Sequence, residues 1–200
     1  MNPTALVLID YFGIAVFAIS GALLAAEKRQ TLVTFIFFAV ATGVGGGTLR
    51  DLLIGAPVFW VHANATLLIC IAAALLVWVL SRRWFAGRAL LWFDAAGLAA
   101  YATYGSAKAL GFGVAPVPAF AMGVLTACAG GIIRDLLASE PSILMRPELY
   151  VTAAALAAGL FVGLTLLGVG PLAAMVAALA GFALRGIAIA RGWSLPAYRD

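Results

Sequence analysis

Long apolar runs alternate with short polar breaks along the whole chain. A helix needs roughly 20 apolar residues to cross about 30 Å of hydrocarbon. Seven runs meet this length, at 5–26, 31–54, 63–81, 90–110, 115–137, 148–168 and 171–190. The breaks between them leave no room for a second domain. The pattern predicts an all-α membrane protein with seven transmembrane helices in one domain, residues 1–200.

A glycine-rich phrase occurs twice, with an offset of 84 residues. It reads TGVGGGTLRDLL from Thr42 and TACAGGIIRDLL from Thr126, and the same offset relates Asp10 to Asp94 without a gap. We therefore predict two tandem repeats of three helices and one appended helix, over 5–84, 90–168 and 171–190. Because three is odd, the second repeat enters the membrane from the opposite side, as in the inverted repeats of many transport proteins.

The basic residues predict the orientation, because they collect on the cytoplasmic side of membrane proteins. With the amino terminus outside, the cytoplasmic set is Lys28, Arg29, Arg82, Arg83, Arg88, Arg134, Arg146, Arg185, Arg191 and Arg199, and the outer set is Arg50 and Lys108. This bias predicts an outside amino terminus and a cytoplasmic carboxyl terminus in a prokaryotic plasma (inner) membrane.

Composition narrows the class of function. The chain is 65% hydrophobic and 10% charged, whereas soluble domains are about 25% charged. The net charge of +4 is scattered between apolar runs, which gives no nucleic-acid surface. We find no Cys/His cluster, phosphate-binding loop, catalytic triad or dinucleotide fingerprint in the sequence. We therefore expect no enzyme activity, no cofactor and no metal centre.

The glycines of the repeated phrase allow two interpretations. They are Gly45, Gly46 and Gly47 in the first copy, and Gly130 and Gly131 in the second. Small residues at this spacing let two helices pack closely. Glycine also destabilises a helix by up to about 1 kcal/mol against alanine, so the same residues can kink or break it beside a water path. Because the clusters match in both halves, we favour the second interpretation and predict a pore there.

Each phrase ends in an Arg-Asp pair, Arg50-Asp51 and Arg134-Asp135. Such residues can snorkel to lipid headgroups. Each pair follows its last glycine by only three residues, however, and a charge facing lipid at that depth costs about 2.5 kcal/mol or more. We therefore predict that the pairs face water and form the two mouths of the path.

The fourth run carries a polar stripe at helical spacing: Asp94, Gly97, Tyr101, Tyr104 and Lys108. The first run carries Asp10, Gly13, Phe17, Ser20 and Leu24 at the equivalent places. The second copy thus has two phenols and an ammonium that the first lacks. Lys108 can snorkel from near the end of its run, or act as a movable gating charge. We favour the gate, with Asp10 and Asp94 as further pore charges.

With its paired GGGxxRD and GGxxRD phrases, the chain resembles the prokaryotic trimeric intracellular cation (TRIC) channels, whose repeated domain is also labelled a glycine-transporter domain. The resemblance implies a homotrimer in lipid, and a potassium- and sodium-permeable pore in each protomer between second and fifth helices kinked at their glycines. The family's basic gating residue matches Lys108. Ala129 departs from the pattern, since it replaces the glycine equivalent to Gly45, and the Lys-Glu dipeptide of phosphoinositide-binding animal members is absent.

The residues alone are compatible with two functions. The first is a passive potassium-permeable channel of modest selectivity, because the TVGYG filter is absent. The second is a secondary transporter of a small solute such as glycine, since inverted repeats and half-helix ends suit a carboxylate equally well.

Overall fold

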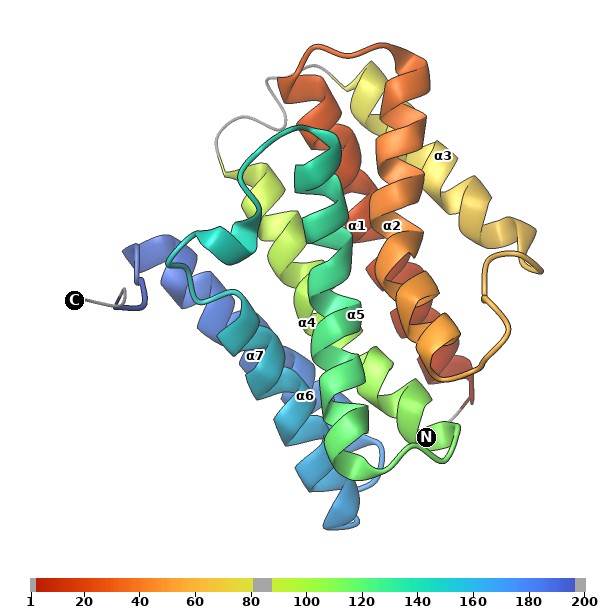
Figure 1. Cartoon of the computed structure of the whole chain (residues 1–200), viewed down its shortest axis with the longest axis vertical. Coiled ribbons are helices and arrows are strands. Elements are labelled where there is room, and N and C mark those ends of the chain that lie inside the picture. The colour runs from red at the N-terminus through yellow and green to blue at the C-terminus, as the bar shows by residue number, and fades with distance from the viewer. Residues whose placement is uncertain (1–2, 81–87, 197–200) are drawn as a thin grey trace.

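The computed structural model describes residues 3–80 and 88–196, with side chains from Val7 onward (Figure 1). Its helices are α1 (Pro3–Glu27), α2 (Leu32–Leu53), α3 (Asn64–Val79), α4 (Ala89–Gly111), α5 (Pro116–Leu137), the 3₁₀ turn η1 (Ile143–Met145), α6 (Val151–Leu166) and α7 (Leu172–Arg191). No strand occurs in the described ranges, so the all-α prediction is confirmed. Arg82, Arg83 and Arg199 lie outside the described residues.

The seven predicted runs each form one helix, but the helices differ as membrane spans. Helices α1, α2, α5 and α7 are long and apolar enough to cross a membrane. Helices α3 and α6 have 16 residues each, which is shorter than the roughly 20 that a perpendicular span needs. Helix α4 has 23 residues and carries Asp94 and Lys108 within them.

Local chemistry sets several helix ends. The Thr31 side chain accepts a hydrogen bond from the Thr34 amide and caps α2, which satisfies one free amide of the first turn. Pro116 opens α5 at a position where its missing amide costs nothing. Helix α7 ends at Arg191 and is capped by Gly192, whose φ of 68° is the left-handed conformation that glycine adopts readily.

Helices α2 and α5 lie side by side at the centre and run in opposite directions (Figure 1). Helix α1 packs against α2 and α3, and α4 packs against α5 and α6. Helices α1 and α4 also contact each other and run in opposite directions, while α7 covers α4 and α6. The second three-helix unit is thus inverted relative to the first.

Phe17 of α1 and Tyr101 of α4 meet where the two repeats join, with ring centroids 5.4 Å apart. Each ring covers a glycine of the other helix: a Cβ atom on Gly13 would lie 2.5 Å from Tyr101 Cε1, and one on Gly97 would lie 2.9 Å from Phe17 Cδ2. Both pairs are related by the offset of 84. The two repeats therefore join across a pseudo-two-fold axis.

Candidate functional site

One set of buried charges lies near the carboxyl end of α2, and we call it the Asp51 cluster (Asp10, Arg50, Asp51, Phe59, Tyr104 and Lys108). Arg50 Nε donates to Asp51 Oδ1 over 2.9 Å. Lys108 Nζ donates to Asp51 Oδ2 over 2.9 Å, and the Phe59 amide donates to the same oxygen over 3.0 Å. Asp51 therefore binds two cations and one backbone amide while it is fully buried.

Aromatic rings enclose the two cations of the Asp51 cluster. The Arg50 guanidinium lies 5.0 Å from the Tyr104 ring centroid, and Lys108 Nζ lies 5.6 Å from that of Phe59. The Asp10 carboxylate lies near the Tyr101 and Tyr104 side chains and interacts electrostatically with Arg50 and Lys108. A cation within about 6 Å of a ring face gains roughly 0.5–2 kcal/mol, so the rings help to hold both cations in place.

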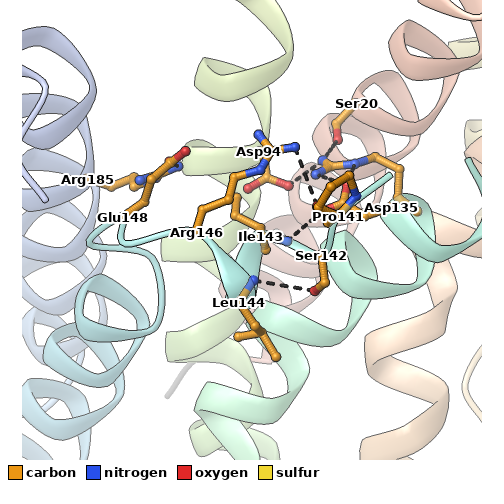
Figure 2. A network of polar contacts seen from close by, with 11 residues as sticks. Ser20, Asp94, Asp135, Pro141, Ser142, Ile143, Leu144, Arg146, Glu148 and Arg185 are labelled. Atoms are coloured by element: carbon orange, nitrogen blue, oxygen red, sulfur yellow. Dashed lines mark hydrogen bonds and ion pairs between the residues drawn. The ribbon is translucent and has the colours of Figure 1, made fainter. Parts of the chain in front are cut away.

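A second set lies near the carboxyl end of α5, and we call it the Asp135 cluster (Ser20, Asp94, Arg134, Asp135 and Ile143; Figure 2). Arg134 Nε and Nη2 donate to Asp135 Oδ1 over 3.0 and 2.8 Å. Arg134 Nη1 donates to Asp94 Oδ1 and to Ser20 Oγ, over 2.6 Å each. The Ile143 amide donates to Asp135 Oδ2 over 2.9 Å. One guanidinium thus links α1, α4 and α5.

The two clusters repeat the same contacts at the offset of 84. Phe59 and Ile143 are equivalent, and each amide caps the aspartate eight residues before it. Ser20 and Tyr104 are equivalent too, and each contacts the arginine of the opposite repeat. Since α2 and α5 are antiparallel, the clusters lie at opposite ends of the contact between these two helices.

Backbone contact fills the space between the clusters. A Cβ atom on Gly130 would lie 2.7 Å from the Thr42 carbonyl oxygen, and one on Gly46 would clash with that of Thr126. These pairs are again related by the offset of 84. Helices α2 and α5 therefore touch through their main chains at the pseudo-two-fold axis.

Known proteins are similar to this chain in sequence. The family model described as "Glycine transporter" matches residues 7–82 and again 91–166. The UPF0126 inner membrane protein YadS of Escherichia coli is 38% identical over 150 residues, 72% of each chain. A UPF0126 membrane protein of Vibrio cholerae is 38% identical over 76% of this chain, and the match spans 65% of that protein's length.

Solved structures match over nearly the whole chain. A TRIC trimeric intracellular cation channel orthologue from Rhodobacter sphaeroides is 42% identical, with a TM-score of 0.87 over 95% of this chain and 100% of its own. The chain belongs to the TRIC family. A second TRIC cation channel is 31% identical, with a TM-score of 0.85 over 96% of this chain and 97% of its own.

The Arg-Asp pairs of this TRIC protein lie neither at the lipid headgroups nor in water, the two locations that the sequence suggested. Arg50 is 0% exposed and Arg134 is 2% exposed, so neither snorkels to headgroups. Asp51 and Asp135 are buried as well, so neither aspartate is exposed to water in this conformation. That the pairs form the two mouths of a pore stays a prediction. Removing charges from water is costly unless good pairing compensates, and the clusters provide that pairing.

The glycines do not break the helices, so that part of the prediction is wrong, whereas a kink at the glycines stays a prediction. Both α2 and α5 continue as α-helix through Gly45, Gly46 and Gly47 and through Gly130 and Gly131. At Gly46 and Gly130 glycine instead lets the two backbones approach closely, because a side chain would not fit there.

The remaining glycines of the phrase face side chains. A Cβ atom on Gly45 would meet Ile133, one on Gly47 would meet Phe59, and one on Gly131 would meet Tyr150 and Asp94. In this TRIC protein Gly45, Gly46 and Gly130 make room within the α2–α5 contact, and Gly47 and Gly131 make room for side chains next to it.

Sequence reasoning missed Phe59, Ile143 and Tyr150. The first two could have been found, because they occupy equivalent positions in the two repeats. Tyr150 has no such signal. Its hydroxyl is buried without a hydrogen-bond partner, as is Asp94 Oδ2; an unsatisfied buried group costs about 1–3 kcal/mol.

Proposed function

We propose that this protein is a passive channel for monovalent cations, permeable to potassium, with a pore inside each protomer of a homotrimer. The observation that carries the proposal is the pair of charge clusters at the two ends of the α2–α5 contact. Channel relatives with nearly the same fold, the TRIC cation channels, support it. The pore follows α2 and α5, past Gly46 and Gly130.

The described conformation corresponds to a closed pore in this proposal. The main chains of α2 and α5 touch at their glycines, and the Tyr101 hydroxyl lies 3.5 Å from the Gly43 carbonyl oxygen. Opening separates these helices and withdraws Lys108 from Asp51, so that water replaces the lysine. One charge moving through the whole field changes the energy by about 2.3 kcal/mol per 100 mV, which makes Lys108 a suitable voltage-dependent gate.

The orientation belongs to the same proposal. The amino terminus lies outside a prokaryotic inner membrane, and the carboxyl terminus lies in the cytoplasm. In that orientation the Asp51 cluster, which includes Asp10, forms the outer mouth, and the Asp135 cluster forms the inner mouth. Lipid surrounds the trimer.

Single-channel recording in planar bilayers tests the proposal. We expect unitary potassium currents from purified protein, and Lys108→Ala changes their open probability or its voltage dependence. Lys28→Ala is the matched control, because Lys28 pairs with Glu140 and contacts neither cluster in the described chain. Saturable glycine flux without unitary currents would instead establish the transporter.

A further inference from the structure

We infer that the Asp135 cluster binds one monovalent metal cation, sodium or potassium. The charges of the two clusters carry this inference. The Asp51 cluster holds two carboxylates, Asp10 and Asp51, and two cations, Arg50 and Lys108. The Asp135 cluster holds two carboxylates, Asp94 and Asp135, but one cation, Arg134. The first cluster is neutral, whereas the second has a net charge of −1.

A single substitution between the repeats produces this difference. Lys108 lies one turn after Tyr104 on α4, and it pairs with Asp51. The equivalent residue of α1 is Leu24, one turn after Ser20, and Ser20 contacts Arg134. Leu24 is 6% exposed and belongs to the hydrophobic core. The position that supplies an ammonium to one cluster therefore supplies only apolar surface to the other.

Unpaired atoms in the clusters have opposite character. In the Asp51 cluster they are donors: Arg50 Nη1 has no acceptor, and Nη2 lies 2.8 Å from Asp51 Oδ1 without hydrogen-bond geometry. In the Asp135 cluster the unpaired atom is the acceptor Asp94 Oδ2. The Tyr150 hydroxyl is also unpaired, and it lies against Gly131 on the side where Asp94 Oδ1 lies. Asp94 and Tyr150 are each 1% exposed. Two buried oxygen atoms are thus available to a cation.

Other basic groups of the described chain near this end have partners elsewhere. Arg185 pairs with Glu148 over 2.5 Å, although its guanidinium also lies 5.4 Å from the Tyr150 ring centroid. Lys28 pairs with Glu140. Arg88 donates to the Ile189 carbonyl oxygen over 2.7 Å. Arg146 is exposed and donates to the Pro141 carbonyl oxygen. None of these groups contributes a contact to Asp94 or Asp135.

The donor set indicates the class of ion. Carboxylate and phenol oxygens suit hard cations. A net charge of −1 is neutralised by one monovalent ion. The site therefore fits sodium or potassium, the ions of the proposed channel.

Thermal melting of purified trimer tests the inference, in KCl or NaCl against N-methyl-D-glucamine chloride at equal ionic strength. A bound ion stabilises the folded state by mass action. At an ion concentration roughly five times the dissociation constant, removing the metal cation lowers the melting temperature of the wild type by about 2–4 °C. Leu24→Lys supplies the missing ammonium and abolishes this shift, whereas Leu24→Met keeps it.

Two further variants keep the test decisive if Leu24→Lys does not fold. Asp94→Asn removes the net charge almost without a change of shape, so its melting temperature no longer responds to the ion. Lys108→Leu gives the Asp51 cluster the same net charge of −1, so its response becomes larger than that of the wild type.

Three results would overturn the inference: no response in the wild type, an unchanged response in Asp94→Asn, or a response to pH in place of the metal cation. The last would mean that a proton neutralises the cluster. The inference deepens the proposed cation function, but its readout is stability and not current. Failure of ion binding therefore leaves the channel proposal standing, and failure of conduction leaves the ion site standing.

Discussion

Substituting Gly130 by alanine tests whether the backbone contact between α2 and α5 closes the proposed pore. The new Cβ atom would lie 2.7 Å from the Thr42 carbonyl oxygen, whereas ordinary contacts begin at 3.4 Å. Because the obstacle is backbone and not a flexible side chain, the helices must separate locally by about 0.7 Å, the difference between these distances. Overpacking of this kind costs about 1–3 kcal/mol.

The same substitution has an opposing effect that needs a control. Alanine is more favourable than glycine within a helix by up to about 1 kcal/mol, so we expect Gly130→Ala to destabilise by about 1 kcal/mol net. Gly163 of α6 has no atom within 4 Å of its added Cβ position. Gly163→Ala therefore shows the helix preference alone, and we expect it to stabilise by up to about 1 kcal/mol.

Melting temperatures at one heating rate compare the two variants. A difference of about 2 kcal/mol corresponds to about 4–8 °C for a chain of this length. In bilayers, Gly130→Ala should also raise the open probability, because the substitution loosens the closed contact. If Gly130→Ala melts at or above Gly163→Ala and conducts like the wild type, the glycine contact neither limits packing nor closes the pore.

Three other predictions concern single contacts. Phe59→Ile installs the residue of the equivalent position, Ile143, and removes a cation–π contact worth about 0.5–2 kcal/mol; single-channel recording should show a higher open probability. Arg185→Met leaves Glu148 without its partner and should destabilise by about 1–3 kcal/mol, measured by melting, whereas an unchanged melting temperature would make that pair dispensable. The Lys28 ammonium lowers the pKa of Glu140, so this pair contributes stability above the ordinary carboxyl pKa and loses it as pH falls through the lowered value. The melting difference between wild type and Lys28→Gln should therefore shrink in acid; a constant difference would exclude the pair as its cause.

The sequence predicted the helices well because apolar runs of this length have few alternatives to a membrane helix. The largest difference is at α6, which was expected from residue 148 and begins at Val151. Glu148 forms an isolated bridge with Ser194 instead, and the Leu195 amide donates to the Pro147 carbonyl oxygen over 2.7 Å. This contact joins segments far apart in the chain, so no local pattern could indicate it.

The glycines show why the site was harder to predict than the fold. A glycine run indicates that space for side chains is missing, but not what occupies that space. For Gly46 and Gly130 the neighbour is a carbonyl oxygen of the opposite repeat, which depends on how two helices dock. The arginines pose a similar problem. Arg50 and Asp51 leave the helix in different directions, yet the long arginine side chain folds back onto its neighbour.

The inverted repeat makes the departures from symmetry informative. Two repeats folded alike place each residue in an environment that its counterpart also occupies, so packing alone would favour similar residues at both places. Lys108 and Leu24 break that rule where a charge matters most, beside the carboxylates that end the α2–α5 contact. One cluster then carries its own neutralising ammonium, while the other depends on a mobile ion. A cation that arrives at the Asp51 cluster must displace the Lys108 ammonium, which is part of the chain. A cation that arrives at the Asp135 cluster enters a site that lacks one positive charge. In the proposed channel the two ends consequently differ in how they respond to voltage and to ion concentration.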